Sequence, residues 1–164
     1  MAPATTYYYC AIASNSVGTA FGSVVTFTTP AGPQVTTSAA TSVTSTSATL
    51  NGTGDANGST ASGYFRYSTT DPGTCNDAFG SRAPTSGGSS LTGTSPLAYA
   101  QSVSGLSPGT TYYFCAIATN AEGTGFGSVL SFTTAAAPTA TTSAASSITS
   151  TGATLNGSGD PNLA

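Results

Sequence analysis

The sequence predicts an all-β protein built as a β-sandwich. Apolar and polar residues alternate with a period of two in several short segments, which is typical of strands with one buried face. Clusters of Gly, Pro and Asn separate these segments. Apolar residues at helical spacing are missing, and helix formers other than Ala are scarce. We therefore expect antiparallel strands without helices.

The alternation is clearest in three predicted strands, residues 46–52, 63–68 and 111–119. Within each segment every second side chain points to the same face of the sheet. In the second segment, Tyr64 and Arg66 lie on the face opposite to the predicted core. The predicted inward-facing residues are Ala48, Leu50, Phe65, Tyr67, Tyr112, Phe114, Ala116 and Ala118.

The chain repeats itself with a period of 105 residues. Residues 1–59 align without a gap to residues 106–164, and well over half of the aligned positions are identical. This period fits one small β-sandwich domain. The sequence predicts a C-terminal half-repeat in residues 1–29, a complete repeat in residues 30–134 and an N-terminal half-repeat in residues 135–164. The two ends are either cut edges of a tandem array or half-domains by design.

One motif carries a resemblance to a known family. The segment LSPGTTY, Leu106 to Tyr112, resembles the Leu-x-Pro-x-Thr-x-Tyr signature of fibronectin type III domains. In that family the tyrosine hydroxyl bonds back to the backbone of the preceding turn, an arrangement called the tyrosine corner. The resemblance therefore assigns a tyrosine corner to Leu106, Pro108 and Tyr112.

The resemblance extends over residues 35–134. SATLNG, residues 47–52, is similar to strand B of the family, and ATNAEGTGFGSVLSFTT, residues 118–134, is similar to its last strands and the turn between them. The best fit is to Ser/Thr-rich type III-like repeats that occur in tandem in bacterial surface and secreted proteins. The chain lacks the family's strand-B Trp, so the expected aromatic core consists of Phe65, Tyr67, Tyr112, Phe114, Phe126 and Phe132.

The repeat also explains the odd number of cysteines. Cys10 and Cys115 occupy the same position in successive repeats, whereas Cys75 lies in a segment that occurs once. We therefore expect a disulfide between Cys75 and Cys115, which would contribute roughly 3 to 4 kcal/mol by constraining the unfolded chain. The alternative is three free thiols. Cys10 is either an orphan thiol or a bridge to another chain.

Composition excludes most kinds of chemistry. Charged residues make up 4% of the chain, the formal net charge is −3, and there is no His and no Lys. Nucleophilic triads then lack their base, and a metal site lacks ligands, so we expect no enzyme, no metal and no cofactor. A basic patch for nucleic acid is missing. Apolar runs are shorter than the roughly 20 residues of a membrane helix, so we expect no membrane insertion.

The remaining polar candidates have structural explanations beside the functional ones. Asp55 and Asp160 are repeat equivalents in predicted turns, while Asp71 and Asp77 flank Cys75 and could assist a weak Ca²⁺ site. The sequons predict possible N-glycosylation at three residues, for which Asn-Gly turns are the alternative. These residues are Asn51, Asn57 and Asn156.

These observations predict a structural role outside the cell or on its surface. Ser and Thr supply 57 residues (25 and 32), which makes the predicted surface neutral and rich in hydroxyls. We expect a repeat module of a fibre, filament or stalk, with adjacent repeats or further copies, joined head to tail through the half-repeats, as partners. The alternative is a carbohydrate- or surface-binding accessory module of a secreted enzyme or adhesin, which would contact surface glycans through the tyrosines of residues 7–9 and 112–113.

Overall fold

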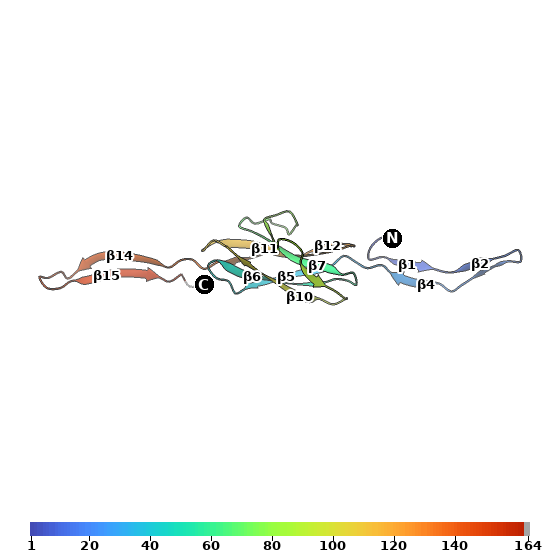
Figure 1. Cartoon of the computed structure of the whole chain (residues 1–164), viewed down its shortest axis with the longest axis horizontal. Coiled ribbons are helices and arrows are strands. Elements are labelled where there is room, and N and C mark those ends of the chain that lie inside the picture. The colour runs from blue at the N-terminus through green and yellow to red at the C-terminus, as the bar shows by residue number, and fades with distance from the viewer. Residues whose placement is uncertain (163–164) are drawn as a thin grey trace.

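The computed structural model describes residues 1–162, and within this range it contains strands and turns but no helix. Figure 1 shows a two-layer sandwich in the middle and one long hairpin on either side of it. The N-terminus and residue 162 lie at the ends of the two hairpins that face the sandwich, so the hairpin turns form the far ends of the described part of the molecule. The described residues contain no helix that is long and apolar enough to cross a membrane. The last two residues of the predicted half-repeat 135–164 lie outside the described range.

Two antiparallel sheets form the central sandwich. The first has the strand order β10-β6-β5. In the second, β11 pairs with β7 on one side and with β12 and β13 on the other, while β7 also pairs with β8 and β9. This is the strand arrangement of an immunoglobulin-like or fibronectin type III-like sandwich, so the predicted fold class is confirmed. The strands are β5 (Gln34–Thr41), β6 (Ser47–Asp55), β7 (Ala61–Ser68), β8 (Ser81–Ala83), β9 (Ser89–Leu91), β10 (Leu97–Ser104), β11 (Thr111–Asn120), β12 (Gly123–Phe126) and β13 (Leu130–Thr133).

The main core lies between these two sheets. Leu50 of β6 faces Phe65 of β7 and Phe114 of β11, and all three side chains are fully buried. The ring centroids of Phe65 and Tyr99 lie 5.0 Å apart, and the Tyr99 hydroxyl donates a hydrogen bond to the Ile117 carbonyl. All the inward-facing residues predicted for β6, β7 and β11 belong to this core.

Phe126 is the exception among the predicted aromatic core residues, because its side chain is 45% exposed. It pairs directly with Ile117 across β11 and β12. Residues directly opposite each other in an antiparallel pair share one face of the sheet. Ile117 points away from the main core, and Phe126 therefore points away with it.

The outer face of the second sheet carries a smaller apolar cluster. The loop between β7 and β8 folds over this face and places Cys75 and Phe79 against Cys115 and Ile117. Cys115 is therefore directed outward and is nevertheless fully buried. Burial of this face depends on the loop, which belongs to the segment of the chain that occurs only once.

The two flanking hairpins are single-layered ladders. We call residues 2–29 the N-terminal hairpin and residues 139–160 the C-terminal hairpin. Among the described strands, each of their strands pairs only within its own hairpin, so neither hairpin has a second sheet over it. The strands are β1 (Thr6–Tyr9) with β4 (Val25–Thr28), β2 (Ile12–Ser14) with β3 (Thr19–Phe21), and β14 (Thr139–Ser146) with β15 (Thr154–Asp160).

Candidate functional site

The tyrosine corner forms in the complete repeat as predicted. The Tyr112 hydroxyl accepts a hydrogen bond from the backbone N–H of Ser107 at 2.9 Å. Leu106 is buried in the main core, and Pro108 lies in the exposed turn before β11. The corner therefore fixes the turn that leads into the central strand of the second sheet.

The N-terminal hairpin repeats this local structure without a sandwich around it. The Tyr7 hydroxyl accepts a hydrogen bond from the Ala2 N–H at 2.8 Å, which is the equivalent corner. The Tyr7 and Phe27 rings stack with centroids 5.6 Å apart, the same separation as that of Tyr112 and Phe132 in the complete repeat. The hairpin thus has the local geometry of the last strands of a complete repeat.

The C-terminal hairpin likewise repeats the local structure of the first strands of the sandwich. The side-chain amide of Asn51 donates to the Ala39 carbonyl, and that of Asn156 donates to the Ala144 carbonyl, both at 2.8 Å. Each bond spans the irregularity in register between the two strands of its pair. Strand pairing and these side-chain bonds therefore shape both hairpins locally.

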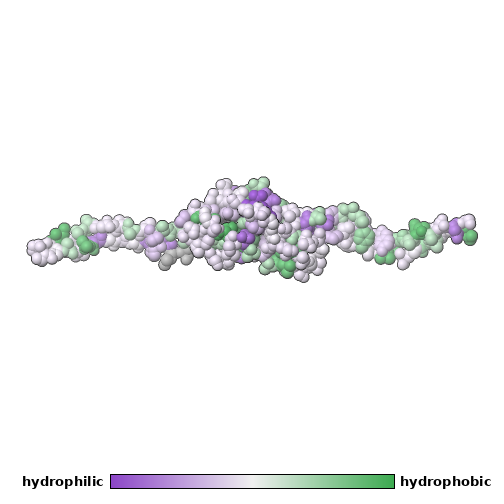
Figure 2. All heavy atoms as spheres, viewed as in Figure 1, coloured by the Kyte–Doolittle hydropathy of each residue, from purple (hydrophilic) through white to green (hydrophobic). Residues whose placement is uncertain are grey.

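What the hairpins lack is burial of their apolar side chains. Leu50 is 0% exposed, whereas its repeat equivalent Leu155 is 87% exposed. Phe114 is 0% exposed, whereas Tyr9 at the equivalent position is 56% exposed. Figure 2 shows hydrophobic residues at several places on the surface of both hairpins. Other exposed large side chains of the hairpins are Tyr8, Ile12, Val17, Phe21, Val24, Val25, Phe27 and Ile148.

The predicted disulfide between Cys75 and Cys115 is confirmed. The two Cα atoms lie 6.0 Å apart, and the bond ties the loop between β7 and β8 to β11. Cys10, the repeat equivalent of Cys115, is an exposed free thiol. On the same outer face of the N-terminal hairpin, Ile12 and Val24, the repeat equivalents of Ile117 and Val129, are also exposed.

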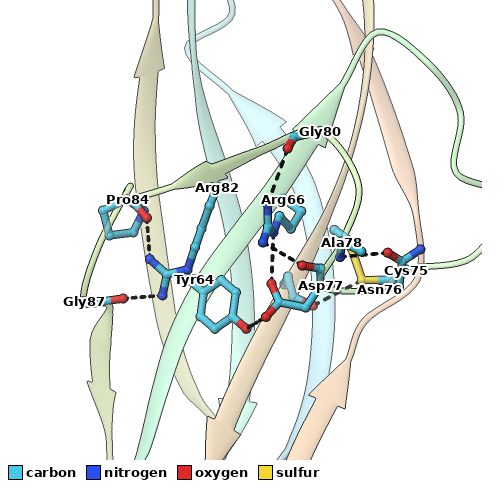
Figure 3. Close-up of polar contacts among 12 residues, drawn as sticks. Tyr64, Arg66, Cys75, Asn76, Asp77, Ala78, Gly80, Arg82, Pro84 and Gly87 are labelled. Atoms are coloured by element: carbon cyan, nitrogen blue, oxygen red, sulfur yellow. Dashed lines mark hydrogen bonds and ion pairs between the residues drawn. A yellow bond between two sulfur atoms is a disulfide. The ribbon is translucent and has the colours of Figure 1, made fainter.

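A polar cluster beside the disulfide uses both arginines of the chain (Figure 3). The Arg66 guanidinium donates to the Asp77 carboxylate at 2.9 Å, and the Tyr64 hydroxyl donates to the same carboxylate at 2.8 Å. Arg82 lies over the Tyr64 ring, 3.9 Å from its centroid, and donates to two backbone carbonyls. These contacts occupy both guanidinium groups: those of Arg66 and Tyr64 fasten the loop to β7, and those of Arg82 hold the connection between β8 and β9.

The cluster also changes how two of its groups titrate. Burial, together with the hydrogen bond to Asp77, raises the pKa of the Tyr64 hydroxyl to about 12. Partial burial alone would raise the pKa of Asp77, but the hydrogen bonds from Arg66 and Tyr64 outweigh it and hold that pKa below its usual value. Asp77 therefore stays ionised as the acceptor of the cluster.

The other predicted acidic candidates lie in turns. The Asp55 carboxylate accepts from the Asn57 N–H, and the Asp160 carboxylate accepts from the Asn162 N–H. Asp71 accepts from the N–H of Gly73 in its own turn. Within residues 1–162, groups of three or more potential metal-ligating side chains are not found.

The three sequon asparagines also use their side chains inside the protein. Asn51 and Asn156 make the hydrogen bonds that span the register irregularities, and Asn57 donates to the Gly32 carbonyl at 2.6 Å. Asn57 has a left-handed backbone with φ 51°, which asparagine tolerates in turns. Each of the three side-chain amides thus has a structural role, and their glycosylation stays a prediction.

Models of protein families give no match to this chain, and neither do curated proteins. Among solved structures, the chain is similar to the sensor domain of the anti-sigma factor RsgI4 of Pseudobacteroides cellulosolvens in a short and a long form. Identity is 22% to both, with TM-scores of 0.43 and 0.41, over 63% of this chain and 95% and 90% of those chains. It is also similar to the FN1-FN3 domains of chicken CNTN1, with 19% identity and a TM-score of 0.46, over 82% of this chain and 44% of that chain. At these values the likenesses carry no functional conclusion.

Proposed function

We propose that this chain is a structural repeat module of an extracellular fibre or cell-surface stalk, without a catalytic role, in which β-sandwich units are joined end to end. The observation that carries the proposal is the exposed apolar face of each terminal hairpin, because Leu50 and Phe114, the equivalents of Leu155 and Tyr9 on these faces, are buried in the complete repeat. The missing half comes from another copy of the chain or from an adjacent repeat of the same polypeptide. Removal of apolar surface from water is the main driving force for such joining.

The positions of the hairpins support a linear array. They leave the sandwich on opposite sides, so the two hairpins of one chain do not face each other (Figure 1). A contact between unlike surfaces that does not close into a ring continues from copy to copy. Each added copy of the chain would then lengthen the array by one sandwich and one joint.

The properties of the central sandwich suit a spacer. Its Cys75–Cys115 disulfide is of the kind that persists in oxidising compartments, which supports an extracellular place of action. Charged residues are few, and both arginines are engaged within the sandwich, so its surface offers mainly hydroxyls and amides. A spacer with such a surface keeps the joints apart and does not attract charged molecules.

A carbohydrate- or surface-binding accessory module is the second candidate. The observation in its favour is the strong exposure of Tyr8 and Tyr9, since aromatic rings can stack on sugars. Tyr9, however, stands at the position of the buried Phe114, and a joint between half-repeats would cover it. Binding of the chain to immobilised glycans, retained when the joints are blocked, would favour this second candidate.

The test compares the assembly of three purified chains by negative-stain electron microscopy and sedimentation velocity. The first is the chain itself, and the second carries Leu155→Glu, which places a charge on the apolar face. The third carries Thr154→Glu, which adds the same charge at the neighbouring exposed residue on the other face of β15. We expect linear assemblies from the first and third chains and a monomer from the second. Monomers from all three at high concentration would reject joining between copies and restrict the proposal to adjacent repeats of one polypeptide.

A further inference from the structure

We infer that the joint is a reduced sandwich in which the N-terminal hairpin of one copy packs face to face on the C-terminal hairpin of a second copy, in the register of the complete repeat. This inference rests on the proposed function and specifies its partner. The template lies in the same chain, because residues 30–59 and 106–134 are the repeat equivalents of the two hairpins and already pack on each other.

One hydrogen bond links the two sheets of the template in the middle of the contact. The Ala116 N–H of β11 donates to the hydroxyl of Thr37 in β5 at 3.0 Å, and both residues are buried. The repeat equivalents of these residues, Ala11 and Thr142, are unchanged in type. The joint can therefore make the same bond.

The close approach of the two sheets also carries over. A Cβ on Gly52 would lie 2.7 Å from the Ala116 Cβ, so only glycine fits at this point of β6. The equivalents Gly157 and Ala11 keep this pair. The C-terminal hairpin thus offers the flat, glycine-bearing surface that Ala11 requires.

The direction of packing agrees with a linear array. In the template, a Cβ on Gly32 would lie 3.7 Å from the Gly123 Cα, so the start of β12 lies against the segment just before β5. The equivalents are Gly18, at the tip of the N-terminal hairpin, and Ala137, at the base of the C-terminal hairpin. Each hairpin tip therefore reaches the base of the other hairpin, and two copies overlap along their arms without contact between their sandwiches.

Two differences make the joint weaker than the complete repeat. Ala20 replaces Gly125, where a Cβ would press on the Pro33 carbonyl oxygen, so the equivalent strands of the joint must separate locally. The joint also lacks equivalents of β7 and β10 and of the loop that carries Cys75. In the joint, the inner face of the N-terminal hairpin is covered, while Ile12 and Val24 on its outer face stay exposed. We therefore expect a reversible joint.

Disulfide trapping tests this register directly. In a Cys10→Ser background, one copy carries Gly18→Cys and the other carries Ala137→Cys, so that a cross-link between the two variants reports the joint. In the template, a Cβ on Gly32 would lie 3.7 Å from the Gly123 Cα, so the two Cα atoms are close enough for a disulfide. The control replaces Ala137→Cys by Thr154→Cys, which is also exposed but lies on the opposite face and near the hairpin tip.

In mixtures oxidised with glutathione disulfide, we expect the first pair to form the mixed dimer faster than the control by about tenfold or more, because the joint raises the local thiol concentration. Equal rates in a chain that still assembles would overturn this register and leave the proposed function standing. Equal rates in a chain that stays monomeric would overturn the inference and the self-assembly on which it rests.

Ala20→Gly provides a second measurement that needs no cross-link. It removes the methyl group that prevents close approach, and the joint should then associate more tightly in sedimentation velocity, with a several-fold lower dissociation constant. The control variant Ser14→Gly lies in the facing strand of the same hairpin, with its side chain on the other face, and accounts for the added flexibility of glycine. Equal tightening by both variants, or weaker association of Ala20→Gly, would contradict the proposed register.

Discussion

The complete repeat and the terminal hairpins place nearly the same residues in opposite environments. Leu50 lies in a closed core and Leu155 in solvent, although the neighbouring asparagines, Asn51 and Asn156, make equivalent hydrogen bonds. Strand pairing and local side-chain bonds therefore shape a half-repeat, whereas burial of its apolar face requires a second sheet. The comparison teaches that the hairpins have the local structure of the complete repeat but lack a second sheet facing them.

The largest expected difference between the two regions comes from truncating equivalent leucines. Leu50→Ala should lower the free energy of unfolding of the sandwich by about 2–5 kcal/mol, because it leaves a cavity in a closed core. Leu155→Ala should change it by less than about 0.5 kcal/mol in a dilute monomer, since its side chain is exposed. Urea denaturation of both variants measures the two effects. Equal losses would contradict the difference in burial.

The disulfide comes next, because it clips the sandwich but has no counterpart in the hairpin. The double variant Cys75→Ala/Cys115→Ala should lose about 2–4 kcal/mol of unfolding free energy. Cys10→Ser should leave the unfolding of the sandwich unchanged, because Cys10 is an exposed free thiol. Denaturation midpoints of the two variants make the comparison, and a comparable loss from Cys10→Ser would show that the hairpin contributes to the stability of the sandwich.

Removing the two tyrosine corners should change the free energy of unfolding by amounts that differ less than those for the leucines and the cysteines. Tyr112→Phe removes the acceptor of the Ser107 N–H and should cost about 1 kcal/mol of unfolding free energy. Tyr7→Phe removes an equivalent bond that is open to water, so its effect on the sandwich should fall within the error of a thermal denaturation experiment. A larger effect at Tyr7 would reverse the expected order.

The smallest expected effect is a pH dependence confined to the sandwich. The contacts of Asp77 lower its pKa in the folded state, so their stabilisation is present above the unfolded-state pKa near 3.8 and is lost as the pH falls through the folded pKa. Asp77→Asn should flatten this acidic part of the stability curve. Asp71→Asn keeps the Asp77 contacts and should keep that part of the curve, which acid titration of the melting temperature can show.

Alternation and repetition predicted much of the sandwich from the sequence. They placed Ala48 and Leu50 on the inner face of β6, and the repeat singled out Cys75 as the partner of Cys115. The assignment of Phe126 to the core was wrong, because the glycines on both sides of it give no apolar alternation from which its face of the sheet could be predicted. Tyr99 was missed for another reason: its burial and its bond to the Ile117 carbonyl depend on contacts between distant strands.

The polar cluster could not be predicted from the sequence either. Arg66 and Asp77 are 11 residues apart, and the loop between them has no regular pattern, so sequence alone does not indicate that they pair. The candidate joint was easier to predict, because Leu155 and Tyr9 could be matched to Leu50 and Phe114 through the repeat. The exposure of these residues required the structure.

Hydrogen–deuterium exchange of the whole chain, followed by mass spectrometry over a series of protein concentrations, tests the central claim most directly. If each hairpin supplies the facing sheet of the other, amide protection of β1–β4 and of β14–β15 should rise together with concentration while that of β6 and β11 stays high and constant. Protection that rises in only one hairpin, or in neither at concentrations where the chain assembles, would contradict the claim.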